Sequence, residues 1–238
     1  MSQIRNKEYH MAPGANVSVR LYDLGDMPCR PEEIPEGQAD EVLAGIPWIA
    51  QRESHNVLTN IGRAWLRNLS GAASYGSIAP GTGYIEGGGF VLTSERVAYM
   101  GLGVGGSFSS APYFATQEEL VTVSALEDFV KITSSPTYLK LVLPQTTVNG
   151  SFPDSYTIRF TSILASSEVS FAGNTSKSAQ AVGTNVPVSE AGLYLSGATP
   201  TANLDHVDNN TRLVAYNIFT PIPVTPNVVL RIDWDFLF

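Results

Sequence analysis

The glycine-rich segment Gly101-Leu-Gly-Val-Gly-Gly106 is the first place in this chain where residue type and spacing could support chemistry. It has the pattern G-x-G-x-x-G and follows a predicted strand, as a dinucleotide-binding loop does. Such a loop must open a helix whose N-terminal amides face the phosphates. The residues that follow, 107–112, include a proline and show no helical periodicity. We therefore interpret the segment as a strand end and a turn, and we predict no cofactor.

Acidic residues and histidines are the next candidates. Asp233 and Asp235 share one face of the last predicted strand and could act as an acid and base pair, but such carboxylates more often protect a sheet from edge pairing. The oxygen-rich segment 205–210 lacks the glycine and the regular ligand spacing of a calcium loop. The three histidines are far apart in the sequence: His10, His55 and His206. A Ser-His-Asp triad with distant members stays open in principle, but no G-x-S-x-G motif occurs, and we predict no catalytic or metal-binding residue.

Cysteine and tryptophan complete the residues that could support a function. The single cysteine, Cys29, excludes an intrachain disulfide and a cysteine metal cluster, which suits assembly in a reducing cytosol. Trp48, Trp65 and Trp234 could together form a platform for a sugar. We expect Trp65 and Trp234 to lie in the core, whereas both a core and a surface position stay open for Trp48.

Composition limits the classes of partner. The formal net charge is −8 and the isoelectric point is about 4.8, so repulsion disfavours binding to nucleic acid or to an anionic membrane surface. The N-terminus lacks an apolar signal segment and no run approaches the eighteen apolar residues of a membrane span, so neither is predicted. Charged residues make up only 15% of the chain, against roughly 25% in average soluble domains. A surface so poor in charge favours extended contact with other proteins.

Periodicity predicts one amphipathic helix and a series of strands. The helix is expected from an N-cap at Asn56 to a stop at Ser70-Gly71, with apolar residues at Val57, Ile61, Trp65 and Leu69. In the final run Leu230, Ile232, Trp234, Phe236 and Phe238 alternate with charged residues, which is typical of a half-buried strand. Further strands are predicted over 97–104, 119–124, 129–133, 138–143, 156–164, 169–171, 192–195 and 212–219, with a hairpin around 84–85 and 90–92. Many short strands bounded by turns predict a mainly β fold, an antiparallel β-sandwich of jelly-roll-like form.

The first fifty residues differ from the rest of the chain. They contain five prolines and a cluster of acidic residues, and only Asn16–Tyr22 resembles a strand. Prolines at this density disfavour helix interiors and central strands. We therefore predict an extended arm over residues 1–50 and a single β-sandwich domain over 51–238, with the arm lying on its own domain or on a neighbour.

Five series of residues carry a resemblance to a known group of proteins. They are Asn56–Leu66, Val97–Gly105, Ser189–Tyr194 together with Leu213–Pro223, and the terminal run Leu230–Phe238. Their order resembles that in tailed-bacteriophage virion structural proteins, which include tail, collar or fibre-associated proteins and accessory head proteins. The resemblance implies a non-enzymatic, β-rich building block that assembles in the host cytoplasm, is present in several copies in the virion, and contacts other copies of itself and other virion proteins.

The resulting expectation is a structural subunit, either a decoration or cement protein on the capsid or a component of the tail, neck or baseplate. The head surface is favoured because the resemblance occupies the terminus and no fibre shaft follows it. The alternative is a host-surface carbohydrate-binding or depolymerising module, suggested by the tryptophans and the Gly/Ser-rich loops. For the arm, we predict that deletion of residues 1–45 leaves a soluble folded domain that no longer enters particles.

Overall fold

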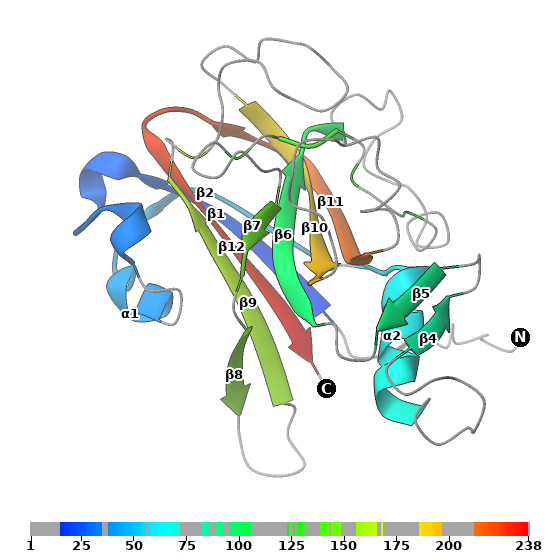
Figure 1. Cartoon of the computed structure of the whole chain (residues 1–238). Helices are drawn as coiled ribbons and strands as arrows, with labels where there is room; N and C mark the ends of the chain where they lie inside the picture. Colours follow the sequence, from blue (N-terminus) through cyan, green and yellow to red (C-terminus); the bar gives the residue numbers. More distant parts are fainter. Residues whose placement is uncertain are drawn as a thin grey trace, which may run out of the picture.

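The computed structural model describes residues 15–34, 38–55, 57–71, 82–85, 89–92, 96–105, 123, 126, 128–130, 132, 139–142, 144–148, 156–165, 168, 186–196 and 212–237. These residues form two antiparallel five-stranded sheets packed face to face, and a separate two-stranded hairpin (Figure 1). The predicted fold class, an antiparallel β-sandwich, is confirmed. The predicted strand at 169–171 and most of the one at 119–124 lie outside the described residues.

Sheet A has the strand order β2-β1-β12-β9-β8. Its strands are β2 (Trp48–His55), β1 (Ala15–Asp23), β12 (Val228–Leu237), β9 (Tyr156–Leu164) and β8 (Pro144–Val148). The strand β1 lies between β2 and β12, and it pairs antiparallel with both. In this sheet the first and the last strands of the described chain are therefore direct neighbours.

Sheet B has the strand order β3-β11-β10-β6-β7. Its strands are β3 (Val57–Leu58), β11 (Leu213–Val224), β10 (Val186–Leu195), β6 (Val97–Gly103) and β7 (Leu139–Leu141). The hairpin consists of β4 (Thr82–Ile85) and β5 (Gly89–Leu92). The C-terminal strands with the clearest sequence patterns are thus divided between the sheets, with β10 and β11 in sheet B and β12 in sheet A.

The core lies between the two sheets and is closed by the inward residues of each strand. On β12 these are Leu230, Ile232, Trp234 and Phe236, which are 0 to 5% exposed. Phe236 meets Phe160 of β9 edge to face, with ring centroids 5.9 Å apart. The predicted inward face of this strand and the core position of Trp234 are confirmed, because apolar side chains at every second residue must share one side of a sheet.

The amphipathic helix α2 (Asn60–Gly71) begins three residues later than predicted. Val57 and Leu58 instead pair with β11 as strand β3, and Thr59 caps the helix. The Thr59 hydroxyl accepts a hydrogen bond from the Gly62 amide at 3.0 Å and donates to the Leu213 carbonyl at 2.5 Å. The helix lies so close to β11 that a Cβ on Gly62 would be 2.0 Å from the Val214 carbonyl oxygen. Trp65 is partly buried and packs against the core.

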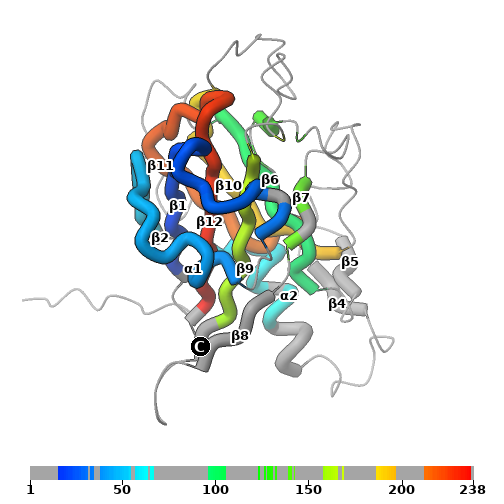
Figure 2. The backbone as a smooth tube through the Cα atoms, turned by 90° about the vertical axis from the view of Figure 1, so that its left-hand side faces the viewer, coloured from blue at the N-terminus to red at the C-terminus, as the bar shows by residue number. Residues whose placement is uncertain are grey.

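The N-terminal region differs from the prediction of an extended arm. The predicted strand at residues 16–22 exists, but it lies in the middle of sheet A and belongs to the sandwich. The connection after it carries three short helices, η1 (Leu24–Asp26), η2 (Pro31–Glu33) and α1 (Ala39–Val42), before the chain re-enters sheet A as β2. This connection crosses the outer face of sheet A, the face turned away from sheet B (Figure 2). The boundary expected at residue 50 therefore does not separate two structural parts.

Candidate functional site: a polar groove on the outer face of sheet A

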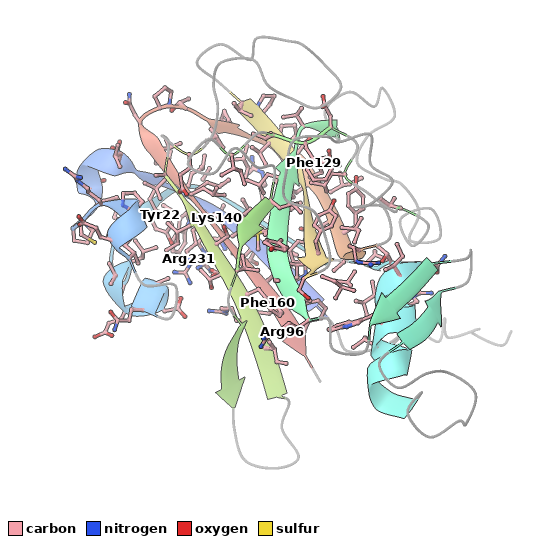
Figure 3. All side chains as sticks on the ribbon, in the orientation of Figure 1. Tyr22, Arg96, Phe129, Lys140, Phe160 and Arg231 are labelled. Carbon is pink, nitrogen blue, oxygen red and sulfur yellow. The ribbon has the colours of Figure 1, made fainter. Side chains whose placement is uncertain are left out.

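The outer face of sheet A has an apolar half and a polar half. In the apolar half, three side chains of β1, β9 and β12 pack against three side chains of the segment that carries η2 and α1. The first three are Tyr22, Ile163 and Val229, the other three are Ile34, Ala39 and Leu43, and all six are at most 6% exposed. Figure 3 shows Tyr22 and Arg231 on the side of the sheet that faces α1. The polar half begins at Arg231 and continues along β12 and β1 toward Asp235 and Asn16. It contains the charged groups that could bind a partner.

The centre of the polar half is a buried ion pair. Arg231 and Asp233 project from the same face of β12 and are each 2% exposed. The Nε atom of Arg231 lies 2.8 Å from one Asp233 carboxylate oxygen and donates to the other at 3.0 Å. The Thr161 hydroxyl donates to the same carboxylate at 2.8 Å, and Arg20 of β1 approaches it at 3.4 Å. Charged side chains are almost never buried unless paired in this way.

A second pair extends the network to the segment that covers the sheet. Arg159 of β9 binds Asp235 through two hydrogen bonds, at 2.7 and 2.8 Å. Its third nitrogen donates to Asp40 of α1 at 2.9 Å, and Arg231 also donates to Asp40. The hydrogen bonds with Asp235 raise the pKa of Arg159 above its already high value, so the side chain stays charged. Asp40 thus links α1 to two strands of sheet A.

The Asp40 carboxyl is held in its ionised form. Burial opposes its ionisation, but the hydrogen bond and charge of Arg231, together with Arg159, outweigh burial and lower the pKa of Asp40 below 3.8. Because the folded-state pKa is lowered, the ionised group stabilises the fold at every pH above 3.8. This contribution disappears as the pH falls from 3.8 through the lower pKa of the folded state.

Replacement of Asp40 by Asn should therefore destabilise the protein more at neutral pH than in acid. We expect the free energy of unfolding at pH 7 to fall by about 0.5 to 1 kcal/mol, since the Asp40 carboxylate is largely exposed and its ion pairs are screened. Urea titrations of the wild type and Asp40→Asn at pH 7 and at pH 3 measure the difference. The wild-type advantage should be smaller at pH 3 than at pH 7, because pH 3 lies below the pKa of the unfolded state, and it should shrink further as the pH falls through the lower pKa of the folded state.

Glu41→Gln is the matched control for this experiment, because it removes a neighbouring exposed carboxylate of the same helix, α1. We expect this variant to match the wild type at both pH values. A loss of stability in Asp40→Asn that is equally large at pH 3 would contradict the ion-pair explanation.

Beside this network the outer face is hollowed into a groove of about 370 Å³. Its walls come from β1, β2, β9 and β12, and its lining consists of Asn16, Val17, Ser18, Arg20, Glu53, Ser54, Arg159, Asp233 and Asp235. Two buried polar atoms of the lining, the Ser18 hydroxyl oxygen and the Arg20 Nε, have no hydrogen-bond partner. Buried polar atoms without partners are uncommon, so these two atoms mark a place where a further polar group can bind.

Trp48 lies beside Arg20, a lining residue of the groove, because of a β-bulge in β2. The register between β1 and β2 shifts after Leu21, so that Ala50 lies opposite Leu21 but Trp48 lies opposite Tyr22. Directly paired residues project from the same face of a sheet, and Tyr22 projects outward. The bulge therefore turns Trp48 to the outer face, where its ring centroid is 5.5 Å from the guanidinium carbon of Arg20. Its side is open to solvent, with 53% of the residue exposed.

The glycine-rich segment has a structural role in sheet B. Gly103 lies against Glu190 of β10, where a Cβ would be 2.2 Å from the Glu190 carboxylate. Glu190 is 0% exposed and accepts hydrogen bonds from the amides of Gly105 and Asp128, at 3.0 and 2.9 Å, and from the Tyr216 hydroxyl at 2.7 Å. The Gly105 amide of this segment thus binds a carboxyl group, but that group belongs to the protein itself rather than to a nucleotide.

The interpretation of Asp233 and Asp235 as solvent-exposed guards was wrong. Asp233 is buried and Asp235 is bound to Arg159, because α1 and the neighbouring arginines cover this face. The structure brings these two aspartates together with Arg20, Arg159 and Arg231. The segment 205–210 and two of the histidines, His10 and His206, lie outside the described residues, and His55 ends strand β2.

No group of three or more His, Cys, Asp or Glu side chains that could hold a metal ion is found among the described residues. None of the helices in the same part of the chain is long and apolar enough to cross a membrane. Comparisons of the chain with protein-family models, with curated proteins and with solved structures found no match. The groove and the surface around it are therefore interpreted from their own geometry.

Proposed function

We propose that this chain is a non-enzymatic structural subunit of a tailed-bacteriophage virion, an accessory capsid protein or a tail, neck or baseplate component. It binds other virion proteins, including copies of itself, through the end of the β1–β2 pair. The proposed contact surface is based on the position of the large apolar residues that are exposed to solvent. Among the described residues these are Leu24, Trp48 and Ile49, which are 38, 53 and 59% exposed.

All three residues belong to one end of the same strand pair. Trp48 and Ile49 begin β2, and Leu24 follows Tyr22, the partner of Trp48, by two positions. The strand β2 is an edge strand of sheet A. At its other end it is tied to sheet B, because the Asn217 amide donates to the Ser54 hydroxyl at 2.6 Å. An apolar cluster on a strand edge is typical of a surface that contacts another protein.

The virion assignment is supported by the resemblance of the motif series, and the low charge of the chain supports extended protein contact. Imaging virions that lack this protein tests the assignment. Intact but fragile heads would indicate a cement role, and missing appendages would indicate a tail, neck or baseplate role. Virions of normal structure and stability would contradict both.

A surface variant tests the proposed contact itself. Introducing charge with Ile49→Asp and Leu24→Asp should reduce binding of the purified protein to particles that lack it by at least about tenfold, because an ion in an apolar contact loses hydration. Cosedimentation of protein with particles measures the bound fraction. Thr220→Asp, which adds one negative charge to an exposed position of β11 away from this end of β2, is the control for the effect of added charge. Equal binding of the Ile49/Leu24 variant and the control would contradict the proposed contact surface.

A further inference from the structure

The groove beside Trp48 points to a second activity of this protein. We propose that it binds a neutral oligosaccharide, with Trp48 as the stacking surface and the polar groups of the groove as hydrogen-bond partners for the hydroxyl groups. This inference does not depend on the proposed virion function. It rests on the volume of the groove, the charge balance of its lining, its unpartnered polar atoms and the exposed ring beside Arg20.

The size of the groove suits a small ligand. Its volume of about 370 Å³ falls within the range of roughly 300 to 1,000 Å³ that is usual for small-molecule sites. The floor is made by side chains of adjacent strands of a sheet and is fixed by the ion pairs of Asp233 and Asp235. Polar groups that are already held in place do not lose conformational freedom when a ligand binds, which favours affinity.

The charge balance of the groove favours a neutral ligand over an anion. Its lining holds the carboxylates of Glu53, Asp233 and Asp235 and the guanidinium groups of Arg20 and Arg159. Arg159 is engaged by Asp235, and Arg20 lies 3.4 Å from an Asp233 carboxylate oxygen and over the Trp48 ring, so neither arginine is available as an unshared cation. The net charge of the whole chain, −8, also repels an anionic ligand.

The hydrogen-bonding groups match a polyhydroxylated ligand. A sugar hydroxyl is both a donor and an acceptor, so adjacent hydroxyls can donate to a carboxylate and accept from a guanidinium group. The groove offers the exposed carboxylate of Glu53 opposite Ser18, whose hydroxyl has no partner, and the partnerless Nε of Arg20. These groups lie along β1 and β2, which lead from the groove to Trp48.

The Trp48 ring completes the site. Arg20 lies over the ring and joins it to the groove, while 53% of the residue remains open to solvent. Large, rigid aromatic side chains provide apolar contact area at little entropic cost and suit the apolar face of a sugar ring. The bulge that turns Trp48 outward thus places an aromatic surface beside a lining residue of a polar groove.

A glycan array of neutral and acidic bacterial-surface oligosaccharides, followed by calorimetric titration of the tightest neutral binder, tests the proposal. We expect binding of at least one neutral oligosaccharide and none of the uronic-acid-containing or sulfated probes. Trp48→Ala and Glu53→Ala should each weaken binding at least about tenfold. Both residues are exposed, so their thermal unfolding should stay close to that of the wild type, which separates loss of the site from loss of the fold.

Ile49→Ala is the matched control, because Ile49 is adjacent to Trp48 and similarly exposed but has no aromatic ring on which a sugar could stack. Unchanged sugar binding in this variant and reduced binding in Trp48→Ala would support the proposal. Three results would overturn it. They are binding of no glycan on the array, binding only of acidic glycans or of a Lys/Arg-rich peptide probe, and equal binding by the wild type, Trp48→Ala and Glu53→Ala. The Ile49→Asp and Leu24→Asp substitutions test the contact with virion proteins, whereas Trp48→Ala and Glu53→Ala test sugar binding. Failure of one proposal is therefore distinguishable from failure of the other.

Discussion

A chain that lacks residues 1–45 is expected to lose its native fold. The deletion removes β1 from the centre of sheet A, and with it Val17, Val19, Leu21 and Tyr22, which are at most 2% exposed. Burial of each such side chain contributes roughly 1.5 to 3 kcal/mol, so the loss is on the order of 10 kcal/mol. This is comparable with the total stability of about 5 to 15 kcal/mol of a typical domain. Solubility after expression and the thermal transition in circular dichroism measure the effect.

A deletion of residues 1–14 is the control, because it leaves every described strand intact. We expect this shorter deletion to keep a cooperative unfolding transition. For the deletion of residues 1–45, the sequence alone predicted the opposite result, namely a domain that stays folded without its arm. A soluble 46–238 fragment with a wild-type transition would contradict the central position of β1.

Replacement of Asp233 by Ala should produce the largest loss of stability among single substitutions in the polar network. It leaves Arg231, whose side chain is 2% exposed, without its main partner, and also removes the acceptor of the Thr161 hydroxyl. Breaking a buried ion pair by removing one member costs about 3 to 5 kcal/mol, because the remaining charge stays desolvated. Urea denaturation at pH 7 measures the change in the free energy of unfolding.

Two further variants make this result specific. Asp235→Ala breaks the pair with Arg159, whose side chain is 29% exposed, and should cost about 1 kcal/mol or less. The double variant Arg231→Met/Asp233→Leu removes both buried charges and should recover most of the loss seen in Asp233→Ala. A double variant that is as unstable as the single one would show that packing, rather than the unpaired charge, explains the loss.

The inward face of each sheet could be predicted because it follows directly from two-residue alternation. The alternation in β12 placed Leu230, Ile232 and Trp234 on one side, and these residues are all buried in the core. Likewise, the four-residue spacing of apolar residues correctly predicted α2. Its start was wrong because Val57 and Leu58 satisfy a strand as well as a helix, and pairing with β11 decides between the two.

The outer face of sheet A could not be predicted, because its burial depends on a segment far away in the sequence. Alternating charged residues have the same pattern on an exposed face and under a cover, and only the position of α1 distinguishes the two cases. One signal was present: Arg231 and Asp233 have opposite charges at positions i and i+2 of one strand, where they can pair. The bulge that turns Trp48 outward has no comparable signal, since Trp48 and Ala50 share a parity in the sequence.

The pairing of β1 with β12 also has a consequence for how the protein reaches its fold. Arg20 and Asp233, which meet across these strands, are separated by 213 positions. Contacts between distant parts of a chain slow folding, because a long loop must close before they form. During synthesis β1 leaves the ribosome well before β12, the strand that completes its pairing. The apolar side of β1 therefore lacks part of its final cover while the residues between the two strands are synthesised, and apolar surface exposed in this way favours aggregation of a folding chain.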